Sequence, residues 1–338
     1  MKRTLTLTLT LTLTLTLTLT LTLALLATLM LAPAALAQSE YPSRPITILV
    51  PFPPGGSSDT VIRPIAQKVS EALKATIVID NRTGAGGNVA ALATKQAAPD
   101  GYTLFLGNNG TLGINAALYK ELRFDPVKDF QPITPIVSFP SVLAVPADLP
   151  ARSVSELVAL AKSRPNGLNF GSQGVGSGGH ILGEMLKLKT GAPMVHVPYR
   201  GAGPAVTDLA AGRIDLLFAS YISVAGQVQA GRLRLLALTA PKRSAVLPNL
   251  PTMAEAGFPG MDVLIWHGMV APAGTPPAIV RKLNEAFVKA AQAPDIVGRV
   301  TPQVADITTS APEDFAKLIA ADIALFSRVI KDAGIKQQ

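Results

Sequence analysis

The sequence predicts an α/β fold divided into two lobes. Short β-branched runs alternate with amphipathic stretches, and two segments rich in proline or glycine interrupt this alternation. Strands that alternate with helices favour parallel sheets. The chain has 338 residues, so that about 300 residues remain after a leader, enough for two lobes with separate cores.

The first 37 residues are predicted to be a cleavable signal peptide. Lys2 and Arg3 precede a long uncharged stretch, and small residues lead up to Ala37, after which we expect cleavage. The Thr-Leu repeat over 4–23 is longer than the usual apolar segment of ~7–15 residues. An uncleaved membrane anchor is therefore the alternative. Cleavage would release the protein into the periplasm.

The remaining chain alternates between the two kinds of element. Strands are expected over 46–52, 76–80, 103–106, 168–170, 195–199, 214–218 and 233–238. Amphipathic helices are expected over 61–73, 155–162, 277–291 and 312–331. Ser153 stands three residues before Glu156, which is the spacing of a capping box at a helix start.

Two segments are predicted to cross between the lobes. Residues 132–146 carry four prolines in an apolar extended stretch, and residues 257–277 are rich in glycine and proline around Trp266. Lobe one would then comprise 41–138 plus 262–338, and lobe two 139–261. Paired crossings of this kind form a hinge.

The composition excludes several classes of function. The chain has no cysteine, which rules out disulfides, thiolate chemistry and cysteine-based zinc sites. A net charge of +8 without a basic run, and with few aromatic residues, does not predict nucleic-acid binding and suits small anions better. The catalytic motifs G-x-S-x-G and H-E-x-x-H and the Walker lysine are missing. We therefore predict neither an enzyme nor a cofactor nor a metal site.

Glycine-rich loops after the strands are the candidate binding elements, because open α/β sheets bind ligands beyond the carboxyl ends of their strands. In the first loop, 53–59, glycines permit close backbone approach, and the following helix start favours an anion. Ser57 and Ser58 would add hydroxyl donors, or serve only as helix caps. Asp59 would repel a carboxylate, so it would contact a ligand ammonium group or act as a cap.

Loop 171–179 follows a later strand and is open to two interpretations. Gly174, Gly176 and Gly179 satisfy G-x-G-x-x-G, the dinucleotide fingerprint. The next strand ends in Arg200 instead of an acidic residue, which leaves NADP as the only dinucleotide that fits. A nest of N–H groups for a carboxylate needs the same glycines and is favoured here. His180 opens the following helix beside this loop.

The order of these loops resembles the Bug/TctC family of periplasmic substrate-binding proteins. The segments that carry the resemblance are VPFPPGG at 50–56, DNR at 80–82, GAGGN at 84–88, PDGYTL at 99–104, NFGS at 169–172, VPYRG at 197–201, GRID at 212–215 and APAGTP at 271–276. The resemblance implies the two-lobed periplasmic binding protein fold of type II. It also implies that loops 53–59 and 172–177 hold a carboxylate, largely through backbone groups and bridging waters.

The resemblance further implies a function and its partners. The solute would be a dicarboxylate, a tricarboxylate, an acidic amino acid or an aromatic acid, captured by hinge closure and delivered by a monomeric protein to two integral membrane subunits. A ligand-sensing component for a membrane receptor kinase is the first alternative, and an NADP-dependent oxidoreductase or a hydrolase the second. The residues predicted to bind the solute are Phe52, Pro53, Gly55, Gly56, Ser57, Ser58, Asp59, Asn81, Asn108, Ser172, Gly174, Gly176, Ser177, His180, Tyr199, Arg200 and Ser220.

Overall fold

The computed structural model describes residues 18, 20, 22, 41–332, 334 and 335. Nearly all of the predicted signal peptide, including its cleavage site, lies outside the described residues. Residues from Arg44 onward form one compact unit. No helix in the described part of the chain is both long enough and apolar enough to cross a membrane.

The strands of this unit form one mixed sheet whose outer parts are parallel. Its order is β2-β1-β3-β9-β4-β7-β5-β6, with β8 and β10 also paired to β4. The strands are β1 (Ile46–Val50), β2 (Ile77–Asn81), β3 (Thr103–Asn108), β4 (Phe130–Pro146), β5 (Leu168–Ser172), β6 (Met194–Pro198), β7 (Leu216–Ser220), β8 (Leu233–Leu238), β9 (Leu264–Pro272) and β10 (Asp306–Ile307). The prediction of parallel sheets is confirmed for β1–β3 and for β5–β7.

That prediction is wrong at the centre of the sheet. β4 and β9 pair antiparallel with each other, β9 with β3, and β4 with β7 and β8. These two strands lie in the segments that were expected to be crossings. β4 accommodates its prolines through register shifts next to Pro132 and Pro135, since proline has no N–H to donate to a neighbouring strand. The proline-rich sequence therefore predicted extended backbone correctly but concealed its pairing.

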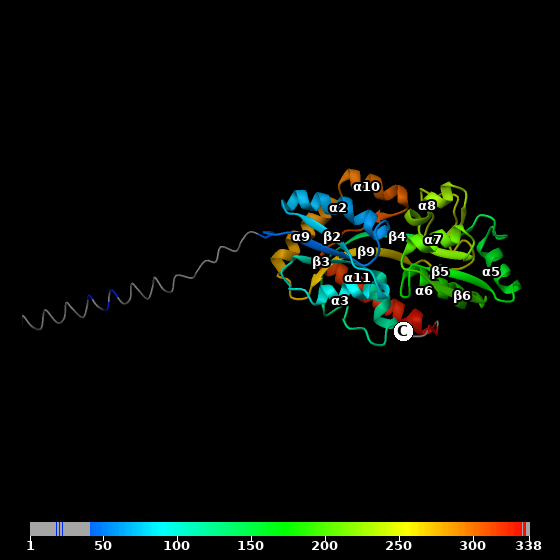
Figure 1. Ribbon diagram of the computed structural model, residues 1–338, viewed down its shortest axis with the longest axis horizontal. Coiled ribbons are helices and arrows are strands. Elements are labelled where there is room, and N and C mark those ends of the chain that lie inside the picture. Colours follow the sequence, from blue (N-terminus) through cyan, green and yellow to red (C-terminus); the bar gives the residue numbers. More distant parts are fainter. Residues whose placement is uncertain (1–17, 19, 21, 23–40, 333, 336–338) are drawn as a thin grey trace, which may run out of the picture. The chain divides into compact units, whose positions relative to one another are not determined.

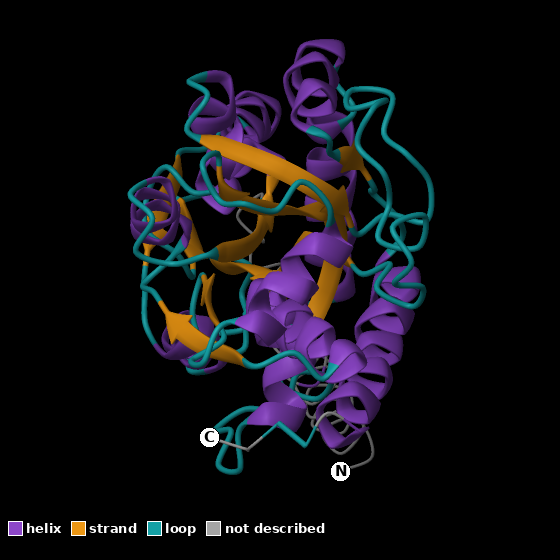
Figure 2. Ribbon diagram, turned by 90° about the vertical axis from the view of Figure 1, so that its right-hand side faces the viewer, coloured by secondary structure: helices purple, strands orange, loops and turns teal. Residues whose placement is uncertain are grey.

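Helices cover both faces of this sheet. Figure 1 shows α2, α3, α9 and α11 around β1–β3, and α5 to α8 around β5 and β6, while Figure 2 shows strands enclosed between helices. The helices are α2 (Ser57–Leu73), α3 (Asn88–Lys95), α4 (Asn115–Leu118), α5 (Val154–Ser163), α6 (Gly178–Thr190), α7 (Ala202–Ala210), α8 (Tyr221–Gln229), α9 (Pro277–Ala291), α10 (Pro294–Val300) and α11 (Pro312–Asp332), with short turns η1 (Ala85–Gly87), η2 (Gly110–Ile114) and η3 (Thr301–Gln303). The predicted cap of α5 is confirmed, since Ser153 Oγ accepts the Glu156 N–H at 3.1 Å.

Separate groups of apolar side chains fill the two ends of the sheet. Phe105, Trp266 and Phe315 lie in one buried cluster beside β3 and β9. Phe170 and Phe218 lie in another, between β5, β7 and α6. Strands such as β7 are buried along their whole length, which explains why their sequences are continuously apolar.

Substitution by alanine is expected to have opposite effects on stability at two helical glycines, Gly183 and Gly226. A Cβ at Gly183 of α6 would overlap the Phe170 ring, whereas a Cβ at Gly226 of α8 would meet no atom within 4 Å. We expect Gly183→Ala to destabilise the protein by about 1–3 kcal/mol through overpacking. Gly226→Ala should stabilise it by about 0.5–1 kcal/mol, because alanine is the better helix former. Urea unfolding of both variants measures the difference, and equal signs would contradict the tight packing of α6 on β5.

Candidate functional site

A cavity lies at the carboxyl ends of the strands, where the loops after β1, β3, β5 and β7 meet. The space inside it that is open to the centre of a water molecule is about 70 Å³. A single water needs ~10–15 Å³ by this measure, so the cavity has room for a small organic molecule. It is lined by Phe52, Gly56, Ser57, Ser58, Gly86, Asn108, Asn109, Gly110, Phe139, Ser141, Gln173, Gly176, Ser177, Gly178, Gly179, Ala202, Ala219, Ser220, Ser223, Ile265 and His267.

The cavity wall is rich in hydrogen-bond donors and carries no charged side chain among its described lining residues. The helices α2, α6 and α7 begin at wall residues, and α8 begins directly after Ser220. The first N–H groups of a helix have no partner within it, and its N-terminus has a partial positive charge. Serine hydroxyls also line the cavity beside these helix starts. The arrangement is therefore suited to an anion held by neutral donors.

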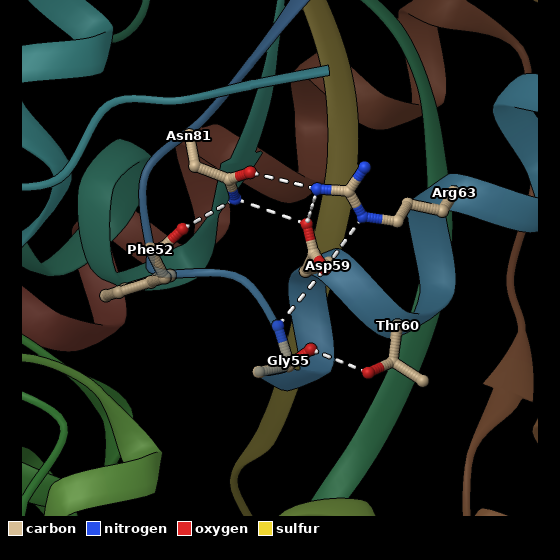
Figure 3. A network of polar contacts seen from close by, with 7 residues as sticks. Phe52, Gly55, Asp59, Thr60, Arg63 and Asn81 are labelled. Atoms are coloured by element: carbon tan, nitrogen blue, oxygen red, sulfur yellow. Dashed lines mark hydrogen bonds and ion pairs between the residues drawn. The ribbon is translucent and has the colours of Figure 1, made fainter.

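Asp59 holds the first loop through a network of polar contacts, which Figure 3 shows. Its Oδ2 accepts hydrogen bonds from Gly55 N at 3.1 Å and Arg63 Nε at 2.8 Å. Its Oδ1 lies 2.7 Å from Arg63 Nη2 and accepts from Asn81 Nδ2 at 3.2 Å. Asn81 Nδ2 also donates to Phe52 O at 2.8 Å. Both carboxylate oxygens are thus engaged, and the network joins the loop to β2 and α2.

The surroundings of Asp59 keep its carboxyl ionised. Burial raises its pKa, but the hydrogen bonds from Arg63, Gly55 and Asn81 outweigh that effect, so the pKa lies below its usual value. The side chain is only 6% exposed. Asp59 and Asn81 do not line the cavity. Asp59 therefore holds the first loop and makes no cap hydrogen bond to α2, while its contact with a ligand ammonium group remains a prediction.

The second glycine loop is held by one buried histidine, His180, and one partly buried histidine, His196. His180 Nδ1 accepts the Gly176 N–H at 3.3 Å, and the His180 ring stacks on His196 with 4.1 Å between centroids. His196 Nε2 lies 2.7 Å from Ser172 Oγ. Burial lowers the pKa of His180 to about 4 and that of His196 to about 3, so both rings are neutral at physiological pH. Ser172 and His180 therefore contact the loop or its histidines through hydrogen bonds, and neither side chain lines the cavity.

The structure brings eight of the predicted residues to the cavity wall. They are Phe52, Gly56, Ser57, Ser58, Asn108, Gly176, Ser177 and Ser220. Gly174, Tyr199 and Arg200 line a neighbouring hollow, which shares Phe52, Gly86 and Gln173 with the cavity. Pro53 lies beside Gly201, and Gly55 belongs to the Asp59 network. Ligand contacts for residues away from the wall remain a prediction.

His267 is a wall residue that the sequence did not single out. It lies on β9, is 3% exposed, and places Nε2 3.3 Å from both the Ser57 and Ser58 hydroxyl oxygens. Burial lowers its pKa to about 4. Its segment had been interpreted as a crossing, so no signal pointed to a ligand. In the described part of the chain, no three His, Asp or Glu side chains gather as a metal site.

Comparisons with known proteins identify the family and the fold. The sequence model of one protein family, described as the tripartite tricarboxylate transporter family receptor, matches residues 61–335 of this chain. Rpa4515 of R. palustris, solved with adipate, is 37% identical with a TM-score of 0.85, covering 88% of this chain and 99% of its own. MatC from Rhodopseudomonas palustris, solved with bound malate, is 34% identical with a TM-score of 0.82, covering 86% and 100%. The periplasmic binding protein BugD is 32% identical with a TM-score of 0.84, covering 88% and 100%.

The fold and the cavity define a solute-binding protein rather than an enzyme, and the predicted α/β fold of type II periplasmic binding proteins is confirmed. The chain belongs to the TctC family, the receptors of tripartite tricarboxylate transporters. Because this family consists of binding proteins, the oxidoreductase and hydrolase interpretations of the glycine loop 171–179 fall away.

Proposed function

We propose that this protein captures a small carboxylate in the cavity and delivers it to two integral membrane subunits of a tripartite transporter. The observation that carries the proposal is the uncharged wall on which four helix starts and several serine hydroxyls converge. Structures of relatives with adipate and with malate support it. The protein acts in the periplasm as a monomer after removal of residues 1–37.

The wall offers a carboxylate two kinds of surroundings. The N–H groups at the starts of α2 and α6, with the hydroxyls of Ser57 and Ser58, can donate to the carboxylate oxygens. Phe52, Phe139 and Ile265 give apolar contact to the carbon skeleton. A small site of this kind takes its orientation from a few polar groups and its contact area from apolar ones.

Capture is proposed to occur by hinge closure between lobe one, 41–138 plus 262–338, and lobe two, 139–261. Ser57 and Ser58 would belong to lobe one, and Ser177 and Ser220 to lobe two, so the cavity draws on both. β4 and β9 would carry the chain between the lobes. A solute that contacts both sides favours the closed state by its differential affinity for it.

A thermal-shift screen of the purified protein tests this function. Malate or adipate at about a hundred times its Kd should stabilise the native state by about 2.7 kcal/mol. That stabilisation corresponds to a rise in melting temperature of roughly 4 °C for a chain of about 300 residues. The diamides of the same acids serve as uncharged controls and should produce no shift. If no carboxylate in a broad panel of organic acids raises the melting temperature, the proposed function is wrong.

A further inference from the structure

His267 is the only titratable side chain among the described residues that line the cavity. Its Nε2 faces two hydroxyls at once, those of Ser57 and Ser58, at 3.3 Å each. Its Nδ1 is buried and has no hydrogen-bond partner in the described part of the chain. The protein thus holds a neutral imidazole in the wall of a site proposed for an anion.

The side chains around His267 leave it electrically isolated. Phe139 of β4 packs on its ring at 5.2 Å between centroids, and Asn108 of β3 stands opposite it in register. On α2, Asp59 is close in sequence to the two serines but is engaged by Arg63. Asp322 of α11 is bonded to Trp266, whose side chain points to the other face of the sheet. Burial is the only cause of the lowered pKa of His267, and no charged group contributes to it.

The shared hydroxyls connect His267 to the solute. A neutral imidazole has one N–H and one lone pair. With the proton on Nδ1, Nε2 accepts a hydrogen bond from the hydroxyl of Ser57 or Ser58. That hydroxyl hydrogen is then not available to bind a solute. A carboxylate accepts hydrogen bonds and donates none, so it competes with Nε2 for the same hydrogens. A proton on Nε2 would reverse this bond and free both hydroxyl hydrogens for the carboxylate.

We propose that His267 takes up one proton from solvent at Nε2 when the carboxylate binds, so that the captured anion faces an imidazolium. This inference rests on the proposed function. The proton adds a positive charge a few ångströms from the anion, in a site partly shielded from water, where the attraction between opposite charges is strong. Nδ1 bears its hydrogen before and after uptake, so the number of hydrogens changes at Nε2 alone.

Proton uptake can be counted by calorimetry. Malate is titrated into the purified protein between pH 6 and pH 8, where malate stays doubly ionised, in buffers of different ionisation enthalpy. We expect close to one proton taken up per solute at pH 6, and a Kd about tenfold lower at pH 6 than at pH 8. Binding without buffer-dependent enthalpy would overturn the inference and leave the proposed function intact. If no carboxylate of the broad panel binds, the proposed function fails, and this inference falls with it.

Matched variants assign the proton to one side chain. His267→Gln retains hydrogen bonding to the serines but cannot titrate, so its Kd should not change between pH 6 and pH 8. His196→Gln removes a partly buried histidine, which does not line the cavity, and should retain the pH dependence. Asp322→Asn should also retain it, although burial raises the pKa of Asp322 to about 6. Uptake that persists in His267→Gln, or is lost in Asp322→Asn, would show that the proton resides elsewhere.

Discussion

Gly176→Ala is expected to weaken solute binding about a hundredfold, equivalent to about 2.7 kcal/mol. Gly176 has φ +77°, a conformation that costs a residue with a Cβ about 1–2 kcal/mol. A Cβ there would also overlap Asn115 Oδ1, a buried oxygen without a hydrogen-bond partner in the described part of the chain. The loop would have to move away from α4 and take the cavity wall with it. Calorimetric titration with malate measures the loss.

Gly191→Ala is the matched control for this prediction. Gly191 also has a positive φ, +61°, but it ends α6 on the far side from the cavity loop, and a Cβ there would meet nothing within 4 Å. Its substitution should cost about 1 kcal/mol of stability and leave the Kd for malate unchanged. Equal loss of affinity in both variants would mean that the effect of Gly176→Ala is a general one and does not arise in the cavity wall.

The glycine loops could be located from the sequence because their chemistry is local. A strand, a glycine run and a helix start follow one another within a dozen residues, and parallel strands bring such loops to one edge of the sheet. Ser57, Asn108 and Gly176 reach the wall for this reason. The boundaries of helices such as α9 were predicted for the same reason, since periodicity and proline at the first turn are local signals.

The contributions of distant segments could not be predicted. His267 reaches Ser57 only because β9 pairs antiparallel between β3 and β4, and nothing in its own segment encodes that pairing. Asp59 has the sequence position of a cap or a ligand contact, but Arg63 and Asn81 engage its carboxylate, the latter from β2. The sequence does not show which partner a polar side chain will bind. The spacing of apolar residues, in contrast, shows which face of a helix or strand is buried. Sequence reasoning therefore found the loops better than the side chains that support them.

Asp59→Ala is expected to destabilise the protein by about 2–4 kcal/mol at neutral pH and to weaken malate binding. The substitution leaves the Gly55 N–H without its acceptor, removes a partner of Asn81 and leaves Arg63 without its ion-pair partner. Removing a buried carboxylate that accepts several hydrogen bonds, and so leaving their donors without an acceptor, typically costs this much, although the Arg63 partner is half exposed. The first loop would lose its attachment to β2, so Ser57 and Ser58 would no longer be held at the wall. Urea unfolding at pH 7 measures the first effect and calorimetry the second.

The pH dependence of this loss has a definite sign. Because the pKa of Asp59 is lower in the folded protein than in the unfolded chain, its stabilisation is fully present above the unfolded value of about 3.9. It is lost as the pH falls through the folded value, so wild type and Asp59→Ala should converge in stability below about pH 4. Asp80→Ala, which removes an exposed partner of Arg82, is the control and should change stability by less than about 0.5 kcal/mol. A gap between wild type and Asp59→Ala that stays constant down to pH 3 would show that the Asp59 carboxylate charge is not what holds the loop.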